Sequence, residues 1–184
     1  MYRLNFVNTE ELIKGCLGND RDCQRELFRR FAPTMLTVCR RYARHYAEAE
    51  DMVQDGFIKV YKNMDRFRGE GSFEGWVRRI MVNTALKYYR KSSFKKELIG
   101  TENVPEKSNE PTVLGDMAEE EILQVISGLP DGYRIVFNMY AIEGFSHREI
   151  SQELGIKEST SRSQLVKARK MLQEKILKLH KSVV

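Results

Sequence analysis

The stretch LPDGYRIVFNMYAIEGFSHREISQELGIKESTSRSQLVKARKML, residues 129–172, decides the fold class. Pro130 is favoured at the first turn of a helix, and Gly144 is favoured just after the last turn. Ser146 and Glu149 have the spacing of a capping box, in which each residue satisfies a free amide at the start of a helix. The stretch therefore predicts two successive helices, the second of which begins at the capping box.

A tight turn at Gly155 is predicted to lead into a last helix from Lys157 to about Leu179. Two short helices joined by such a turn are typical of a helix-turn-helix, whose second helix enters the major groove of DNA. That helix begins with small hydroxyl side chains, and eight bases face two acids between Lys157 and Lys181. Charge alone fits a solvated basic helix on a bundle equally well. The capping box, the glycine turn and the hydroxyls favour DNA binding.

An acidic segment precedes this part of the chain. Residues 97–121 contain eight acids and one base, together with two prolines and two glycines. Such a composition cannot bury enough apolar surface to offset the entropy of ordering the chain. We therefore predict a flexible linker at 97–115, between a first domain at 1–96 and a second domain at 116–184. The alternative interpretation is a merely variable loop.

Apolar residues recur at helical spacing through the first domain. One stripe covers residues 31–42, where Pro33 is expected to bend or interrupt the helix. Further stripes cover 49–64 and 76–89, and two glycines between residues 67 and 72 predict a loop between them. No convincing alternating strand pattern intervenes. The predicted fold class is all-α, with two helical domains joined by the linker.

The last of these stripes is strongly basic. Residues 78–96 include seven bases and no acid, interleaved with aromatic residues. This mixture suits single-stranded nucleic acid, because cations hold the backbone while rings or clefts receive unstacked bases. The amide of Asn83 both donates and accepts, and can therefore bind the Watson–Crick edge of an extracted base. Trp76 has helical spacing and is interpreted as structural support, since such rings more often belong to the core.

An acidic patch is predicted on the helix that covers residues 48–66. Asp51, Gln54 and Asp55 share one polar face through their i, i+3, i+4 spacing, although the formal net charge of the protein is +5. The patch fits a basic partner surface; the alternative is a solvated helix face.

Metal, cofactor and membrane functions are not expected. Cys16, Cys23 and Cys39 form no C-x-x-C pair, and the three histidines are scattered. We predict reduced, partly buried thiols in a cytoplasmic protein that holds no metal, uses no cofactor and acts on no small-molecule substrate. The sequence shows no signal peptide and no membrane span.

Three segments in order resemble extracytoplasmic-function (ECF) sigma factors of bacterial RNA polymerase, and the resemblance covers nearly the whole chain. AEDMVQDGFIKVYKNMDRF, residues 49–67, resembles the helix of that family that binds core polymerase. FRGEGSFEGWVRRIMVNTALKYYRK, residues 67–91, resembles its loop and helix for the minus-ten promoter element. Residues 129–172 resemble its domain for the minus-thirty-five element. Ser161 departs from the family pattern, which usually has an apolar residue there, and Gln164 stands where a base is frequent.

The resemblance implies roles for particular residues. The contacts with the clamp helices of the polymerase β′ subunit fall on Asp51, Gln54 and Asp55. Capture of a flipped non-template base at the minus-ten element, with binding of the nearby backbone, falls on Arg68, Glu70, Ser72, Arg79, Asn83 and Lys87. Recognition of the minus-thirty-five duplex falls on Thr160, Arg162, Ser163, Lys167 and Arg169.

The implied partners are core RNA polymerase, through its β′ clamp helices and β flap, promoter DNA in duplex and single-stranded form, and an anti-sigma factor. The anti-sigma factor would hold the otherwise cytoplasmic protein at the inner membrane. Two other functions remain open. An autonomous helix-turn-helix repressor would bind its operator without polymerase. A nucleic-acid-processing enzyme would need a carboxylate cluster, a Cys–His pair or a phosphate-binding glycine loop, and none is found in the sequence, so no enzymatic activity is expected.

Overall fold

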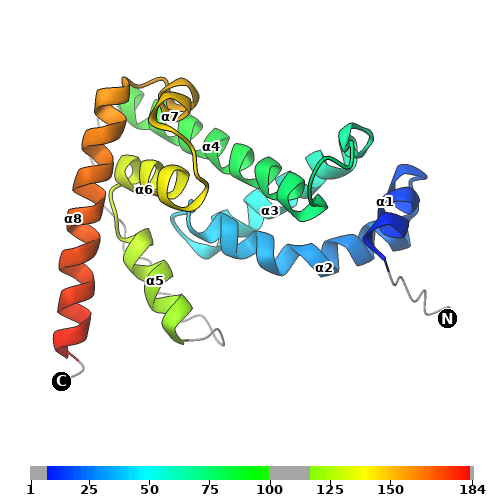
Figure 1. The fold of residues 1–184 in the computed structure, drawn as a ribbon, viewed down its shortest axis with the longest axis horizontal. Coiled ribbons are helices and arrows are strands. Elements are labelled where there is room, and N and C mark those ends of the chain that lie inside the picture. The colour runs from blue at the N-terminus through cyan, green and yellow to red at the C-terminus, as the bar shows by residue number, and fades with distance from the viewer. Residues whose placement is uncertain (1–7, 100–116, 183–184) are drawn as a thin grey trace. The chain divides into compact units, whose positions relative to one another are not determined.

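The computed structural model describes residues 8–99 and 117–182, and within them the side chains of residues 8–91 and 121–178. The chain forms two compact units, one composed of Met1–Cys39 and Tyr46–Ala85, the other of Arg40–His45 and Leu86–Val184. In the described ranges all regular elements are helical and no strand occurs (Figure 1). The all-α prediction is confirmed.

The predicted stripes fall almost wholly within helices, although the helix at residues 9–17 and the first ten residues of the next helix were not predicted. In chain order the helices are α1 Thr9–Leu17, α2 Arg21–Arg40, α3 Tyr46–Lys62, the 3-10 turn η1 Met64–Arg66, α4 Phe73–Ile99, α5 Met117–Ser127, α6 Asp131–Phe137, the π-helical turn η2 Asn138–Ile142, α7 His147–Leu154 and α8 Glu158–Ser182. Helix α4 includes residues 97–99, at the start of the predicted linker. The rest of that linker, residues 100–115, lies outside the described residues.

Helix α2 continues through Pro33, so of the two expected outcomes there, a bend or an interruption, the interruption does not occur. Proline removes one backbone hydrogen bond from a helix interior. The apolar face of α2 offsets this loss, because Leu27, Phe31, Met35 and Val38 are all buried on it. Burial of a large aliphatic or aromatic side chain stabilises a fold by about 1.5–3 kcal/mol.

The core of the first unit lies between α2, α3 and α4. Aromatic rings join the three helices: the ring centroids of Phe28 and Phe57 are 4.7 Å apart, and those of Phe31 and Phe73 are 5.5 Å apart. The ring of Trp76 packs 5.7 Å from that of Phe73. Trp76 is half-buried, and its ring contacts with Phe67 and Phe73 agree with the interpretation as structural support.

Gly56 of α3 lies directly against Met81 of α4. A Cβ atom added there would lie 2.1 Å from the sulfur of Met81, whose side chain is fully buried. Glycine at this position therefore sets the spacing between the polar face of α3 and the basic helix α4.

Replacing Gly56 with leucine should lower the free energy of unfolding by about 1–3 kcal/mol, because the added side chain overpacks the interface with Met81. Urea denaturation of the full chain measures this. Gln54→Leu, with the same new side chain on the exposed face of the same helix, should leave the free energy of unfolding within about 0.5 kcal/mol of the parent. Equal losses for both variants would contradict a steric role for Gly56.

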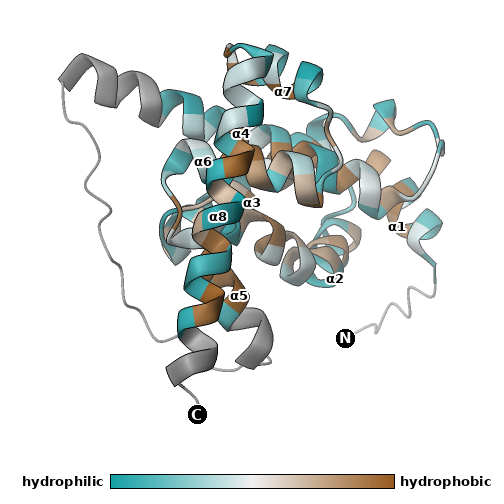
Figure 2. Ribbon diagram, turned by 60° about the vertical axis from the view of Figure 1, so that its left-hand side comes forward, coloured by the Kyte–Doolittle hydropathy of each residue, from teal (hydrophilic) through white to brown (hydrophobic). Residues whose placement is uncertain are grey.

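In the second unit, α8 packs against α5, α6 and α7. The buried face of α8 includes Ala168 and Leu172, which contact Val125, Ile126 and Leu129 of the α5 region. Hydrophobic and hydrophilic residues both recur along α8, as a helix with one buried face requires (Figure 2). This packing leaves the opposite face of α8 open.

Candidate nucleic-acid interface

The start of α7 has the predicted capping box. The hydroxyl of Ser146 accepts a hydrogen bond from the amide of Glu149 at 3.2 Å, and the carboxylate of Glu149 accepts one from the amide of Ser146 at 2.8 Å. At the other end Gly155 has φ +67°, a left-handed conformation that suits glycine. Helix α8 begins at Glu158, so the predicted helix-turn-helix is confirmed.

Ser146→Ala should remove the hydrogen bond that the Ser146 hydroxyl accepts from the Glu149 amide at the start of α7. We expect this to cost about 1 kcal/mol of local stability. Native-state hydrogen exchange should then show about fivefold faster exchange of the amides in the first turn of α7. Ser151→Ala is the matched control, since its exposed hydroxyl donates only to the carbonyl of Arg148. Unchanged exchange in Ser146→Ala would contradict the capping role.

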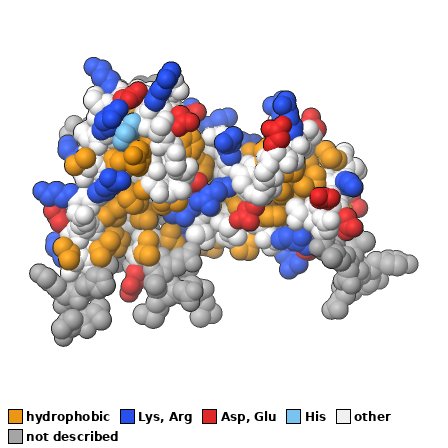
Figure 3. Space-filling view, viewed as in Figure 1, with side chains coloured by type: hydrophobic (Ala, Val, Ile, Leu, Met, Phe, Trp, Pro, Cys, Tyr) orange, Lys and Arg blue, Asp and Glu red, His pale blue; other side chains and the backbone are white. Residues whose placement is uncertain are grey.

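The first turns of α8 separate into a buried and an exposed face. Four residues point into the unit, Ser161, Leu165, Ala168 and Leu172. The outward face is exposed at Ser159, Arg162, Ser163, Val166 and Lys170. Figure 3 shows basic side chains gathered around the start of this helix. Of the predicted contact residues, Arg162 and Ser163 lie fully on this face, whereas Thr160 is half-buried at its edge.

Two basic side chains of α8, those of Lys167 and Arg169, lie on different flanks of the outward face. The ammonium of Lys167 lies 6.0 Å from the ring centroid of Tyr133, and the guanidinium of Arg169 lies 5.8 Å from that of Tyr140. The two residues are about 200° apart around the helix, so they lie on either side of the outward face. Arg162 forms an ion pair with Glu158 at 2.9 Å. Tyrosines from α6 and η2 therefore hold two of the three basic side chains apart.

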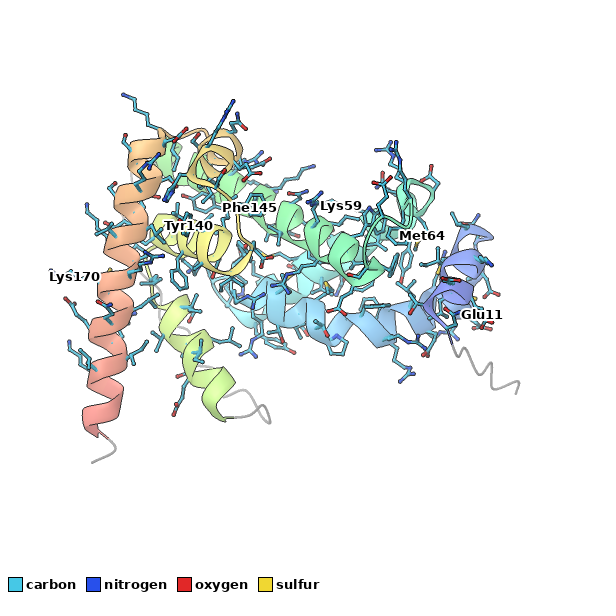
Figure 4. All side chains as sticks on the ribbon, in the orientation of Figure 1. Glu11, Lys59, Met64, Tyr140, Phe145 and Lys170 are labelled. Atoms are coloured by element: carbon cyan, nitrogen blue, oxygen red, sulfur yellow. The ribbon has the colours of Figure 1, made fainter. Side chains whose placement is uncertain are left out.

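Two residues at the centre of the outward face were not among the predicted contacts. Val166 is 66% exposed, and Lys170 lies one turn further along the helix (Figure 4). An exposed aliphatic group can contact a thymine methyl in the major groove. Counting i+7 and i+11 from Ser159 would have found both residues in the sequence.

In the first unit, a loop leads into the basic helix α4. Gly69 and Gly71 have φ of +75° and +87°, which lets the chain reverse there. The hydroxyl of Ser72 accepts from the amide of Gly75 at 3.1 Å and so caps α4. Ser72, Arg68 and Glu70 are all exposed.

The predicted residues of α4 form one exposed line. Arg79, Asn83 and Lys87 recur every four residues and are exposed. The adjacent Thr84 is fully buried and accepts a hydrogen bond from the ammonium of Lys59 on α3 at 2.7 Å (Figure 4). The loop and this line together offer cations and one amide to a nucleic acid.

The polar face of α3 is exposed as predicted. Asp51, Gln54 and Asp55 all lie on it, and Ile58 continues it with 50% exposure. Sequence reasoning missed Ile58 because the buried apolar residues Phe57 and Val60 lie close to it in the sequence. Its position in the sequence therefore does not separate Ile58 from the hydrophobic stripe. The face therefore combines carboxylates with one apolar side chain.

The three cysteines are free and buried. Burial, reinforced by Cys23 and Asp20, raises the pKa of the Cys16 thiol to about 11, so the unreactive thiol is favoured. Among the described residues, no group of three or more metal-ligating side chains occurs. None of the helices searched in the described ranges is long and apolar enough to span a membrane.

A helix-turn-helix with a basic, hydroxyl-bearing outer face, together with a second exposed basic helix, defines a DNA-binding protein of the transcription-factor class. The Sigma-70 region 2 family matches residues 27–94, and the Sigma-70 region 4 family matches residues 119–172. The chain belongs to the ECF sigma factor family of bacterial RNA polymerase and is a transcription initiation factor.

Among its relatives, the ECF RNA polymerase sigma-E factors of Salmonella typhimurium and Escherichia coli K12 are 31% identical over 141 residues, which cover 70% of this chain and 74% of theirs. The sigma-E factor of Haemophilus influenzae is 30% identical over 138 residues, covering 68% of this chain and 73% of its own. The sigma factor RpoE of Bartonella quintana, solved with the anti-sigma factor NepR, shares the fold with a TM-score of 0.55 and 20% identity over 83% of this chain and 95% of that one.

Proposed function

We propose that the first domain, residues 1–96, docks on core RNA polymerase and captures one promoter base, while the second, residues 116–184, reads duplex DNA upstream. The polar face of α3, with Asp51, Gln54 and Asp55, binds the β′ clamp helices. Carboxylates at its centre suit a basic partner surface. The β flap of the polymerase receives the second domain.

The minus-ten element is bound by the loop and the exposed line of α4. Asn83 takes the flipped non-template base, because its amide offers both a donor and an acceptor to a base edge. Arg79 and Lys87, one turn away on either side, hold the backbone. Arg68, Glu70 and Ser72 form the loop side of the same site. Ser72 also caps the N-terminus of α4.

The minus-thirty-five duplex is read by α8. Arg162 and Ser163 point outward. Their contacts with base edges select the promoter sequence, and their contacts with phosphates fix the position of the helix on the duplex. Lys167 and Arg169 lie on opposite flanks, where they fit phosphates on the two walls of the groove. Thr160 contacts the backbone at the edge of this face. The exposed face of α8 is the observation that carries this part of the proposal.

Two linked contacts gain from effective concentration, so neither has to be strong by itself. The linker at 97–115 allows both domains to bind at once. An anti-sigma factor would control the protein by covering its binding faces. The B. quintana sigma factor was solved with such a partner, which supports this proposal. We place the protein in the cytoplasm, with the anti-sigma factor able to hold it at the inner membrane.

The test is transcription in vitro from a promoter panel, with the purified chain and core polymerase. We expect initiation only when both are present, and promoter binding that falls with salt by about 0.9 log units of affinity per log unit of salt for each duplex phosphate contacted. An autonomous repressor would instead bind duplex DNA tightly without core enzyme. Absence of initiation at every promoter would overturn the proposal.

A further inference from the structure

A hydroxyl group lies in the buried face of the recognition helix. Ser161 is fully buried, at the first position of the stripe that Leu165, Ala168 and Leu172 continue. A buried hydroxyl without a partner destabilises a fold. The partner here is Nδ1 of His147, the first residue of α7, 2.9 Å from the Ser161 oxygen.

The imidazole of His147 is itself held by an aromatic ring. Its centroid lies 4.5 Å from that of Tyr140, and the two planes make an angle of 22°, a stacked arrangement. Tyr140 belongs to the π-helical turn η2 (Figure 4), and the guanidinium of Arg169 lies over the same tyrosine ring. π-helical turns often mark functional sites.

The two stacked rings therefore reach α8 at two places. His147 contacts it at Ser161 and Tyr140 contacts it at Arg169, eight residues further on and about 12 Å along the helix axis. Contacts that far apart restrain both the position and the tilt of a helix. The outward side chains Arg162 and Val166 project from the same segment of α8.

We propose that Tyr140, His147 and Ser161 form a polar clamp that positions the recognition helix α8 on duplex DNA. The proposal rests on the proposed reading of the minus-thirty-five element by α8. His147 acts through Ser161 and is a positioning residue, not a base contact. Small displacements of a recognition helix weaken several base and phosphate contacts at once, so the clamp affects affinity without touching DNA.

The charges around His147 make the clamp sensitive to pH. Burial is the main cause that lowers the pKa of His147 below 6.5; Arg162 and Arg169 lower it further, while Glu158 raises it. From η2 the phenol of Tyr140 faces the ring, and from α8 the Ser161 hydroxyl does. The imidazole is therefore neutral near pH 7 in the free protein. Phosphates bound beside Arg162 and Arg169 would add negative charge and favour the imidazolium.

Two opposite pH dependences follow. DNA binding takes up a proton at His147, so affinity for the duplex should rise as the pH falls through the pKa region of this imidazole. Stability should change the other way. Because the folded pKa of His147 lies below the unfolded value of 6.5, its contribution to stability is complete above pH 6.5 and is lost as the pH falls toward the folded pKa. A merely structural residue would show only the second dependence.

The experiment measures binding of a minus-thirty-five promoter duplex to holoenzyme, by fluorescence anisotropy at constant ionic strength between about pH 5.5 and 8. His147→Phe keeps a ring for Tyr140 and removes Nδ1, so affinity should fall about 5–20-fold with a weaker pH dependence. His147→Asn places an amide where Nδ1 lies. It should restore affinity near pH 7.5 without the rise at low pH.

Two further variants complete the design. His147→Phe combined with Ser161→Ala removes both partners of the same hydrogen bond. Because the two residues act through one contact, affinity should fall no further in the double variant than in His147→Phe alone. His45→Asn makes the same chemical change in another part of the chain and should leave affinity and pH profile unchanged. Circular dichroism confirms that each variant is folded.

Wild-type affinity and pH profile in His147→Phe would overturn the clamp. If that variant is unfolded, His147→Asn decides: a folded His147→Asn protein that keeps the rise in affinity at low pH would equally overturn it. If wild-type holoenzyme itself ignores the minus-thirty-five sequence, the proposed function of α8 is wrong and the clamp falls with it. That last outcome is distinguishable, because it appears before any substitution is made.

Discussion

Replacing Asp51 with lysine is expected to weaken binding to core RNA polymerase by about 30–1000-fold. The substitution removes one attraction and places a like charge against the basic partner surface, which costs several kcal/mol when the pair is desolvated. Asp51 is exposed on the face that includes Gln54 and Ile58, so the fold should not change. Competition against labelled wild-type protein for core enzyme measures the effect.

Glu50→Lys is the matched control for this prediction. Glu50 is an exposed neighbour on α3, about 100° around the helix from Asp51, and receives the same change of charge. We expect less than about a threefold loss there, because interactions between exposed charges away from the contact are largely screened by salt. Equal losses for the two variants would show that net charge, and not the face of α3, governs binding to the polymerase.

Replacing Asn83 with alanine should lower promoter-specific initiation by about 5–150-fold, the range for loss of one base-reading contact. The loss should depend on the base. When the captured base is replaced by an abasic nucleotide, wild-type protein should fall to the level of the variant, and the variant should lose nothing more. Open-complex formation on matched and abasic templates, with holoenzyme reconstituted from each protein, measures both effects.

Lys87→Ala provides the contrast on the same exposed line of α4. A phosphate contact carries no sequence information, so this variant should weaken binding about equally on every minus-ten sequence and reduce the salt slope by about one unit. An Asn83→Ala variant that behaves in this manner, or that still distinguishes the base from the abasic site, would remove Asn83 from the capture site.

Much of the fold follows from signals that act within a few residues. The capping box of Ser146 and Glu149, the left-handed Gly155 and the glycine loop before α4 all occur where the sequence predicts them. Helical spacing also predicts that Asp51, Gln54 and Asp55 share one polar face, and all three are exposed. In every case the partner groups lie within one helical turn or one loop, so local sequence contains the whole interaction.

The features that the sequence did not predict depend on contacts between different helices. The sequence places a proline inside α2, and only the burial of that helix on both sides of Pro33 explains why the helix continues. The sequence also places Lys167 and Arg169 two residues apart. It does not show that Tyr133 and Tyr140, from other elements, hold them on different flanks.

The sequence by itself determined the order of most helices, both ends of α7 and the outward faces of α3, α4 and α8, because these depend on backbone hydrogen bonding and on a period of 3.6 residues. Tertiary structure alone decided what holds α8 in place. Ser161 accompanies an apolar stripe in the sequence, and its partner His147 is 14 residues earlier, in another helix. Whether such a hydroxyl is satisfied depends on how two helices pack, and no local pattern encodes that distance.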